Sequence, residues 1–404
     1  NQKLFRNEKF NLKHNLDQFE DLLIYSIKQR IHGHTKVGLL FSGGKDSTAI
    51  AIALSKIQVK NLIAITITNN EMAAFTRRAI KICKNLGIKQ RIINLDNKIL
   101  KESFETLIKY SEQPIGDPAM IPLIAATKKI NDDFDVFIDG TGNDYYFGFV
   151  KQWGYKAYSV RIFLEKVISK KYWPLFIKIL SLVYKPSNSI FKKWSKNIEE
   201  TFVTWDGWDE SEIKNIFDQD INLSKTFLWK KMNDFNKNKA DLIAVQTGVY
   251  GNIWEPHAAT RKGKVVFNKI FKAEVVYPFM DKRIYDFVKT LPIKYKFSKN
   301  GKNKILIREY LKNELSSELL EEKKGDLVFD LNLLLSNYRN LIDDKLLISL
   351  IKVFPNFKMK SLFDFMNDDT NKNSKNHRLY SLLTLSYWLQ NNVKKFKKNT
   401  KKIE

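Results

Sequence analysis

Short apolar runs alternate with amphipathic stretches over the first 140 residues. Four of these runs predict buried strands, at residues 37–41, 62–68, 91–95 and 136–138. Apolar residues at helical spacing predict four helices, at about residues 16–31, 49–57, 73–86 and 121–130. Gly87 follows the third of them, and glycine is typical of the position just after a helix. Strands that alternate with helices predict an α/β fold, a parallel sheet with helices on both faces.

The pattern changes after about residue 150, where strand patterns fade and aromatic, lysine-rich helical patterns follow. We therefore expect a helical lead-in, an α/β core, a mostly helical C-terminal portion and a basic tail, at residues 1–35, 36–150, 151–390 and 391–404. The aromatic and basic stretch from Trp153 to Trp194 either packs internally or meets a partner or membrane surface.

The chain has 404 residues, of which 44% are hydrophobic, and this excludes disorder over its whole length. A net charge of +25 favours an anionic partner such as nucleic acid, a nucleotide or acidic lipid. Only eleven of the 69 basic residues are arginine, however, and specific phosphate and base recognition favours arginine. Coding bias is the other explanation for such a lysine-rich and asparagine-rich composition, and both stay open.

A single cysteine, Cys83, excludes a disulfide scaffold and zinc sites that need several cysteines. The five histidines form no HExxH motif, and the pair His32 and His34 is not favoured as a metal site. No signal peptide is visible, and the longest apolar stretch, 173–184, is interrupted by Lys178. We expect a soluble, cytoplasmic protein without a transmembrane segment.

The most informative motif lies between the strand at 37–41 and the helix that follows. It reads Ser42, Gly43, Gly44, Lys45, Asp46, Ser47. Two glycines allow a tight turn, and backbone N–H groups at a helix N-terminus bind phosphate. The serine hydroxyls add donors. A carboxylate beside phosphates needs a Mg²⁺ ion to bridge them, so Asp46 predicts Mg²⁺.

The loop does not match a Walker A motif, because the order after the second glycine is wrong. It resembles instead the SGGxDS pyrophosphate loop of the ATP pyrophosphatase superfamily. Five later blocks, in order, resemble the synthetase domain of the asparagine synthetase family, which includes β-lactam synthetases and lasso-peptide cyclases. The blocks are residues 112–122, 136–148, 276–281, 291–308 (as Leu291-Pro292 and 304–308) and 323–325.

This resemblance implies an adenine nucleotide α-hydrolase-like fold and an ATP-dependent ligase that forms amides. Such enzymes adenylate a small-molecule carboxylate, release pyrophosphate, and let ammonia or an amine displace AMP. By position, Asp46 and Asp144 would hold Mg²⁺, and loop 42–47 would cradle the pyrophosphate. Lys304 would neutralise negative charge on the phosphates. The mostly helical portion at residues 151–390 would complete the active site. The residues that would frame adenine and ribose are Leu40, Ile67 and Gly140.

Three of these blocks also have purely structural interpretations. Asp144 would suit a turn or helix cap, and Lys304 would suit an exposed helix position. The block at 276–281 is more typical of packing than of chemistry.

Two departures from the family pattern narrow the expectation. Only about 35 residues precede the first strand and no N-terminal cysteine nucleophile is present, so ammonia would come free or from a separate glutaminase, or a substrate amine would replace it. Thr141 stands where the family has a glutamate, and a hydroxyl is no general base near neutral pH. Tyr145, Tyr146 and Glu255 are alternative bases. We expect a substrate other than free aspartate, such as a natural-product acid or, because of Lys45, a sugar acid.

Two other function classes stay open. The charge of +25 favours a tRNA-modifying enzyme with a pyrophosphate loop, although the later blocks argue against it and nucleic acid is not the favoured partner. The departure at Thr141 would also suit a non-catalytic nucleotide-binding protein.

Overall fold

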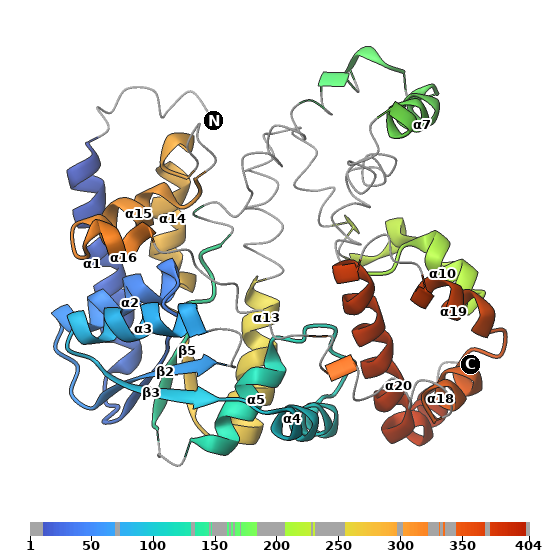
Figure 1. The fold of residues 1–404 in the computed structure, drawn as a ribbon, viewed down its shortest axis with the longest axis horizontal. Helices are drawn as coiled ribbons and strands as arrows, with labels where there is room; N and C mark the ends of the chain where they lie inside the picture. Colours follow the sequence, from blue (N-terminus) through green and yellow to red (C-terminus); the bar gives the residue numbers. More distant parts are fainter. Residues whose placement is uncertain are drawn as a thin grey trace. The chain divides into compact units, whose positions relative to one another are not determined.

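A five-stranded parallel sheet forms the centre of the N-terminal fold, in the strand order β3-β2-β1-β4-β5 (Figure 1). The computed structural model describes residues 11–68, 73–130, 134–144, 147, 160, 163–164, 166–169, 171–183, 207–227, 229–230, 255–296, 302–321, 331, 334–335, 345–367 and 372–400. The strands are β1 (Val37–Leu40), β2 (Leu62–Thr68), β3 (Lys89–Asn94), β4 (Val136–Ile138) and β5 (Glu274–Val276). The predicted parallel sheet is therefore confirmed.

Helical segments cover both faces of this sheet, as predicted. Val37 and Leu39 of β1, with Val136 and Ile138 of β4, belong to the buried core formed with α1 (Leu12–Ile31) and α2 (Lys45–Lys56). Phe137 points the other way, because side chains alternate along a strand. Its ring lies 5.2 and 4.6 Å from the rings of Phe267 and Phe271 in η6 (Gly263–Phe271), a π-helical segment on the second face.

Most predicted elements lie where the pattern placed them. Besides α1 and α2, they include α3 (Ala73–Asn85) and α5 (Met120–Lys129). Gly87 follows α3 with a φ of +66°, the left-handed conformation that glycine favours. Among the strands of the sheet and the helices before residue 140, α4 (Asn97–Tyr110) and β5 were not predicted. Strand patterns fade after about residue 150 in the sequence, yet β5 pairs in parallel with β4 more than 130 residues later.

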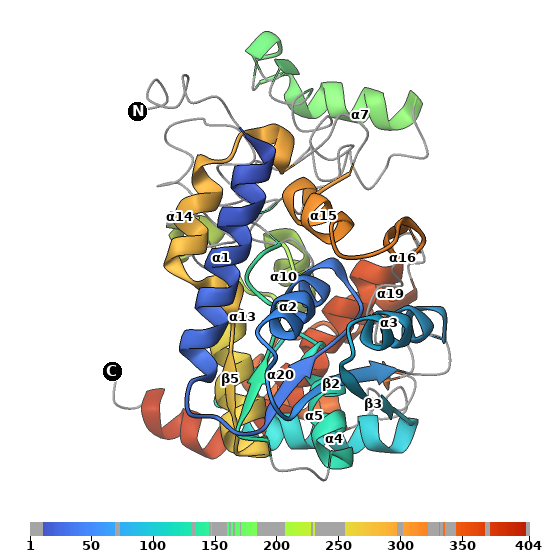
Figure 2. The same cartoon turned by 90° about the vertical axis from the view of Figure 1, so that its left-hand side faces the viewer.

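The segment after β5 packs structure, as the block at 276–281 suggested. It forms η7 (Pro278–Met280) and leads into α14 (Lys282–Thr290), which lies beside α1 (Figure 2). Asp281 caps α14 and accepts a hydrogen bond from Arg30 of α1 at 2.9 Å. Hydrogen bonds from Arg283, opposed in part by burial, hold the pKa of the Asp281 carboxyl well below its usual range. The block therefore joins the sheet to the helices beside it.

The chain divides into two compact units, each built from separated stretches of sequence. Unit one comprises residues 1–96, 122–156 and 241–328, and unit two comprises residues 97–121, 157–240 and 329–404. Unit one contains the sheet and its core, with α13 (Glu255–Lys262), η8 (Ile293–Tyr295), α15 (Ile305–Lys312) and α16 (Ser317–Glu321). The boundaries at 35, 150 and 390 follow composition and stay a prediction.

Unit two is helical in its described part, in agreement with a mostly helical C-terminal portion. It contains α4, α7 (Trp173–Val183), α10 (Glu210–Phe217), η4 (Leu223–Lys225), α18 (Lys345–Val353), α19 (Met359–Asn367) and α20 (Lys372–Thr400). Ile216 and Phe217 pack with Leu350, Leu362 and other buried residues in a separate core. None of the helices in the described part of the chain has the length and apolar character needed to cross a bilayer.

Candidate functional site

The loop at residues 42–47 joins the end of β1 to the start of α2. Gly44 occupies the N-cap position, and no side chain caps the helix there. The N-terminus of a helix carries partial positive charge and favours a nearby anion. Gly43 has a φ of +64°, and a Cβ added to it would lie 3.2 Å from Ala79 of α3. Both the backbone conformation and the space require glycine, as expected for a phosphate loop.

The two serines of the loop stabilise it from within. Ser47 Oγ donates to the Gly44 carbonyl oxygen at 3.2 Å, and Ser42 Oγ accepts from the Gly44 N–H at 3.2 Å. The two hydroxyl oxygens are 3.2 Å apart. In this structure the serine hydroxyls form hydrogen bonds within the loop, and their role as phosphate donors stays a prediction. Lys45 is the first residue of α2.

A second loop, after β4, meets the first. A Cβ on Gly140 would lie 3.4 Å from the Ser47 nitrogen, so the two backbones approach closely there. Gly142 has a φ of +115°, and a Cβ on it would lie 2.4 Å from Met280. The strands before the two loops, β1 and β4, are neighbours, and the sheet grows in opposite directions from them. Ligands of open α/β sheets bind at such a switch point, at the carboxyl ends of the strands.

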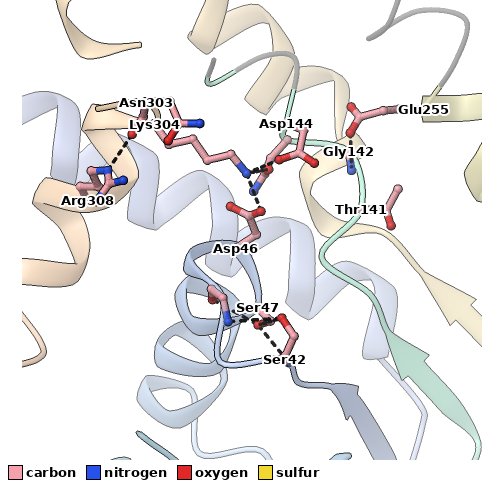
Figure 3. A network of polar contacts seen from close by, with 12 residues as sticks. Ser42, Asp46, Ser47, Thr141, Gly142, Asp144, Glu255, Asn303, Lys304 and Arg308 are labelled. Carbon is pink, nitrogen blue, oxygen red and sulfur yellow. Dashed lines mark hydrogen bonds and ion pairs between the residues drawn. The ribbon is translucent and has the colours of Figure 1, made fainter. Parts of the chain in front are cut away.

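Lys304 joins both loops at this point (Figure 3). Its Nζ donates to Asp46 Oδ2 at 2.5 Å, to Asn143 Oδ1 at 2.9 Å and to Asp144 Oδ1. The residue is buried and occupies the N-cap position of α15 with a left-handed φ of 54°, so the interpretation as an exposed helix residue was wrong. The carboxylate of Asp144 accepts a hydrogen bond from Lys304, so its position does not have to be explained by the capping of a turn. Three sequence-predicted residues thus meet in one cluster.

The charges of this cluster compensate one another. Burial alone would lower the pKa of the Lys304 ammonium, but the carboxylates of Asp46 and Asp144 outweigh burial and raise it. Lys304 is therefore a fixed positive charge beside the N-terminus of α2. A fixed cation next to a helix N-terminus is an anion-binding arrangement.

Thr141 takes part in a neighbouring network that sequence reasoning missed. Lys262 of α13 donates to Asp139 Oδ2 at 2.7 Å and to Thr141 Oγ1 at 2.9 Å, and the Thr141 hydroxyl donates to Asp139 Oδ1 at 2.7 Å. Burial would raise the pKa of the Asp139 carboxyl, but Lys262 outweighs it and the pKa is lowered. Lys262 lies 121 residues from Thr141, and no local motif marks it.

Glu255, at the start of α13, is buried beside the same loop. Its Oε1 accepts a hydrogen bond from the Gly142 N–H at 3.2 Å, while its Oε2 is buried without a hydrogen-bond partner. Burial, followed by the negative charge of Asp144, raises the pKa of Glu255 to about 8. Of the three alternative bases, Glu255 is thus next to the cluster, and Tyr145 and Tyr146 lie outside the described residues.

The two apolar residues expected to frame the nucleotide lie at strand ends. Leu40 ends β1, and Ile67 is the buried second-last residue of β2. Both strands lead to the same edge of the sheet as the glycine loop. Their role in binding adenine or ribose stays a prediction.

The sequence matches the family described as asparagine synthase over residues 18–390. The chain belongs to the asparagine synthase family. An asparagine synthetase (glutamine-hydrolyzing) of Bacillus subtilis strain 168 is 21% identical over 76% of this chain and 48% of its own length. A putative asparagine synthetase (glutamine-hydrolyzing) of Mycobacterium bovis is 28% identical over 35% of this chain and 21% of its own length. The chain spans about half, or less, of these relatives.

Two solved structures are similar over shorter parts of this asparagine synthase family member. An NMN synthetase from Francisella tularensis is 17% identical with a TM-score of 0.25, over 35% of this chain and 60% of the other. A predicted subunit of tRNA methyltransferase from Methanocaldococcus jannaschii is 31% identical with a TM-score of 0.20, over 27% of this chain and 54% of the other. The family assignment therefore depends on the sequence match.

The donor set of this family member fits Mg²⁺ held together with phosphates. Carboxylate oxygens of Asp46 and Asp144 converge on one cation, the Lys304 ammonium. Mg²⁺ prefers such oxygens and is often held by one or two carboxylates plus substrate phosphates. No group of three or more acidic, histidine or cysteine residues suited to a metal occurs in the described part of the chain.

Proposed function

We propose that this chain is an ATP-dependent ligase that adenylates a carboxylate and transfers the acyl group to ammonia or an amine. The single observation that carries the proposal is the buried Lys304, held by Asp46 and Asp144 beside the uncapped N-terminus of α2. This arrangement places a fixed cation, two carboxylates and a backbone anion site at the switch point of the sheet. The cation, the carboxylates and the backbone anion site each suit a nucleoside triphosphate with its metal.

In the first step, a substrate carboxylate oxygen attacks the α-phosphorus of ATP, and pyrophosphate leaves with the bonding electrons. Backbone N–H groups of loop 42–47 and the α2 N-terminus would bind the pyrophosphate, and Lys304 would offset its charge. Asp46 and Asp144 would hold Mg²⁺, which when bound withdraws charge from phosphate oxygens. Asp46 lies in the first turn of α2, and this position would hold its carboxylate beside the proposed anion site.

In the second step, the nitrogen of ammonia or an amine attacks the acyl carbon, and AMP leaves with the C–O electrons. The nitrogen must lose a proton. We propose Glu255 as its acceptor, because burial brings its pKa to about 8, near the working range of a general base. Thr141 would not accept this proton; its hydroxyl is held by Lys262 and Asp139 and would help to shape the acyl pocket.

The substrate we propose is a carboxylate other than free aspartate, a sugar acid or a natural-product acid. The support is the replacement of the family glutamate by Thr141, whose hydroxyl here is hydrogen-bonded to Asp139 and Lys262. The nitrogen donor would be free ammonia, a substrate amine or ammonia from a separate glutaminase.

The test is ATP–pyrophosphate exchange with Mg²⁺ over a panel of sugar acids, amino acids and peptide acids. We expect exchange that depends on one acid class and disappears in Asp46→Asn. Lys312→Gln, an exposed substitution in α15, is the matched control and should retain exchange. Failure of the protein to bind ATP would refute the proposal.

The net charge of +25 favours tRNA modification as a second candidate. That function predicts tRNA binding whose affinity falls steeply with salt and exchange that requires tRNA. ATP binding without exchange under any condition would instead indicate a non-catalytic nucleotide-binding protein.

A further inference from the structure

Unit two contains a helical hairpin that exposes apolar side chains on its outer surface. The described residues between 160 and 167 are helical, and α7 follows after a short break. Trp173 and Ile177 of α7 pack inward against Leu164 and Ile168 of the preceding segment. The hairpin therefore has its own small interior, and its remaining apolar residues are not needed to close it.

Those remaining residues form stripes at helical spacing. On α7 and the residue before it they are Tyr172, Leu175, Ile179 and Leu182, and on the preceding segment they are Val160, Phe163 and Val167. Their exposed fractions are large, with 65% for Phe163, 69% for Val167 and 71% for Leu182. The intervals of three and four residues put each set on one side of its helix. We call these seven residues the outer stripe.

An exposed apolar stripe of this length normally marks a contact surface. Within α7, Lys178 and Ser181 are the two polar residues, so the helix is apolar nearly all round. A helix of that composition is ordinarily buried on all sides. In the part of the chain that the structure describes, one side of α7 packs in the hairpin and the other side is exposed, so the described residues leave the outer stripe uncovered.

The charges around the outer stripe select the partner. Between residues 160 and 185 the sequence has six basic residues and one acidic residue. Three of the lysines, Lys166, Lys171 and Lys178, are exposed on the hairpin itself. A second copy of the chain would bring an equally basic hairpin against the first and would be repelled. An anionic lipid surface accepts apolar side chains below its headgroups and lysines at them.

We propose that this hairpin is a membrane-surface anchor that docks the protein on anionic lipid. The outer stripe enters the boundary between headgroups and acyl chains, and the flanking lysines contact the phosphates. α7 has 11 residues, about half of the roughly 20 needed to span a bilayer, so the hairpin lies in the interface instead of crossing it. The proposal does not depend on the ligase activity.

Co-sedimentation of the full chain with vesicles tests this proposal. Vesicles in which about one lipid in three is phosphatidylglycerol and the rest is phosphatidylcholine should bind the protein. Vesicles of pure phosphatidylcholine should bind it much more weakly. The variant Leu175→Ser/Ile179→Ser/Leu182→Ser should lose at least tenfold in vesicle affinity. Ile348→Ser/Ile351→Ser, which changes two exposed apolar residues of α18, is the matched control and should bind like the wild type.

A second set of variants separates charge from apolar burial. Lys166→Gln, Lys171→Gln and Lys178→Gln should each weaken binding to anionic vesicles by about fivefold or less, with little effect on neutral vesicles. Because all six changed positions are exposed, the variants should melt at the wild-type temperature. Unchanged vesicle binding by the triple serine variant would overturn the proposal. So would a wild-type dimer that this variant dissociates, or wild-type capture by an acidic protein surface without any vesicle binding.

Discussion

Lys304 balances the charge of two carboxylates in the candidate site. Lys304→Met keeps the side chain's bulk but leaves the Asp46 and Asp144 carboxylates facing each other without the ammonium. We expect the free energy of unfolding to fall by about 2 kcal/mol, less than for a fully buried pair because Asp144 is partly exposed. Denaturant unfolding measures this loss.

Mg²⁺ makes the Lys304 prediction more specific. In Lys304→Met the two carboxylates lack their cation, so millimolar Mg²⁺ should raise the unfolding midpoint of the variant more than that of the wild type. Lys302→Met, at an exposed position two residues earlier, serves as the control. Equal Mg²⁺ responses in all three proteins would contradict a metal role for the carboxylate pair.

Glu255 should make stability depend on pH in the direction opposite to an ordinary carboxylate. Its pKa is about 8 in the folded protein, against 4.5 for a free side chain, so the folded state favours the protonated form. The stability that this preference adds to the folded state is fully present below about pH 4.5 and is lost as the pH rises through about 8. Relative to wild type, Glu255→Gln should therefore gain stability as the pH rises between these two values, by about 1.4 kcal/mol for each pH unit. A pH-independent difference in nucleotide-free unfolding would refute the raised pKa.

At the scale of elements, the glycine loop offers a comparison within one chain. Gly43 and Gly87 have nearly the same φ, +64° and +66°, but only Gly43 has neighbours where a Cβ would stand. Gly87→Ala should cost about 1 kcal/mol of stability from backbone strain alone and leave ATP affinity unchanged. Gly43→Ala should cost more, because Ala79 must move, and should weaken ATP binding at least tenfold. Equal effects of the two substitutions on ATP affinity would show that the loop does not contact the nucleotide.

The local elements were predictable where a pattern repeats over several residues. The apolar run of β2 and the glycine after α3 both mark their elements in sequence, and the structure has them where expected. β5 was not predicted: it begins with the charged Glu274, whereas β4, of the same length, is wholly apolar, and the pairing of the two strands is entirely tertiary. The same distinction holds in the site. The glycine loop is a local motif, whereas the burial of Glu255 and the contact of Lys262 with Thr141 arise only from folding.

Lys304 was predictable from the family resemblance but not from a local pattern. Its contact with Asp46 joins residues 258 positions apart, which no local pattern can indicate. Only the resemblance of residues 304–308 to a family block pointed to it. The interpretation of Lys304 as exposed failed because two lysines close together in sequence, Lys302 and Lys304, are typical of a solvated turn. The sequence does not show that two carboxylates surround Lys304 in the folded chain.

At the scale of the whole molecule, the two units each have a buried core, and the proposed nucleotide site lies entirely in unit one. Calorimetric unfolding should therefore contain a transition that Mg²⁺ and ATP raise, because a ligand stabilises the fold that binds it. At a nucleotide concentration about 100 times the dissociation constant, the gain is about 2.7 kcal/mol. Asp46→Asn should abolish this shift, while the triple serine variant of the outer stripe in unit two should retain it. A nucleotide shift that survives Asp46→Asn in full would place ATP elsewhere on the chain and remove the basis of the proposed ligase chemistry.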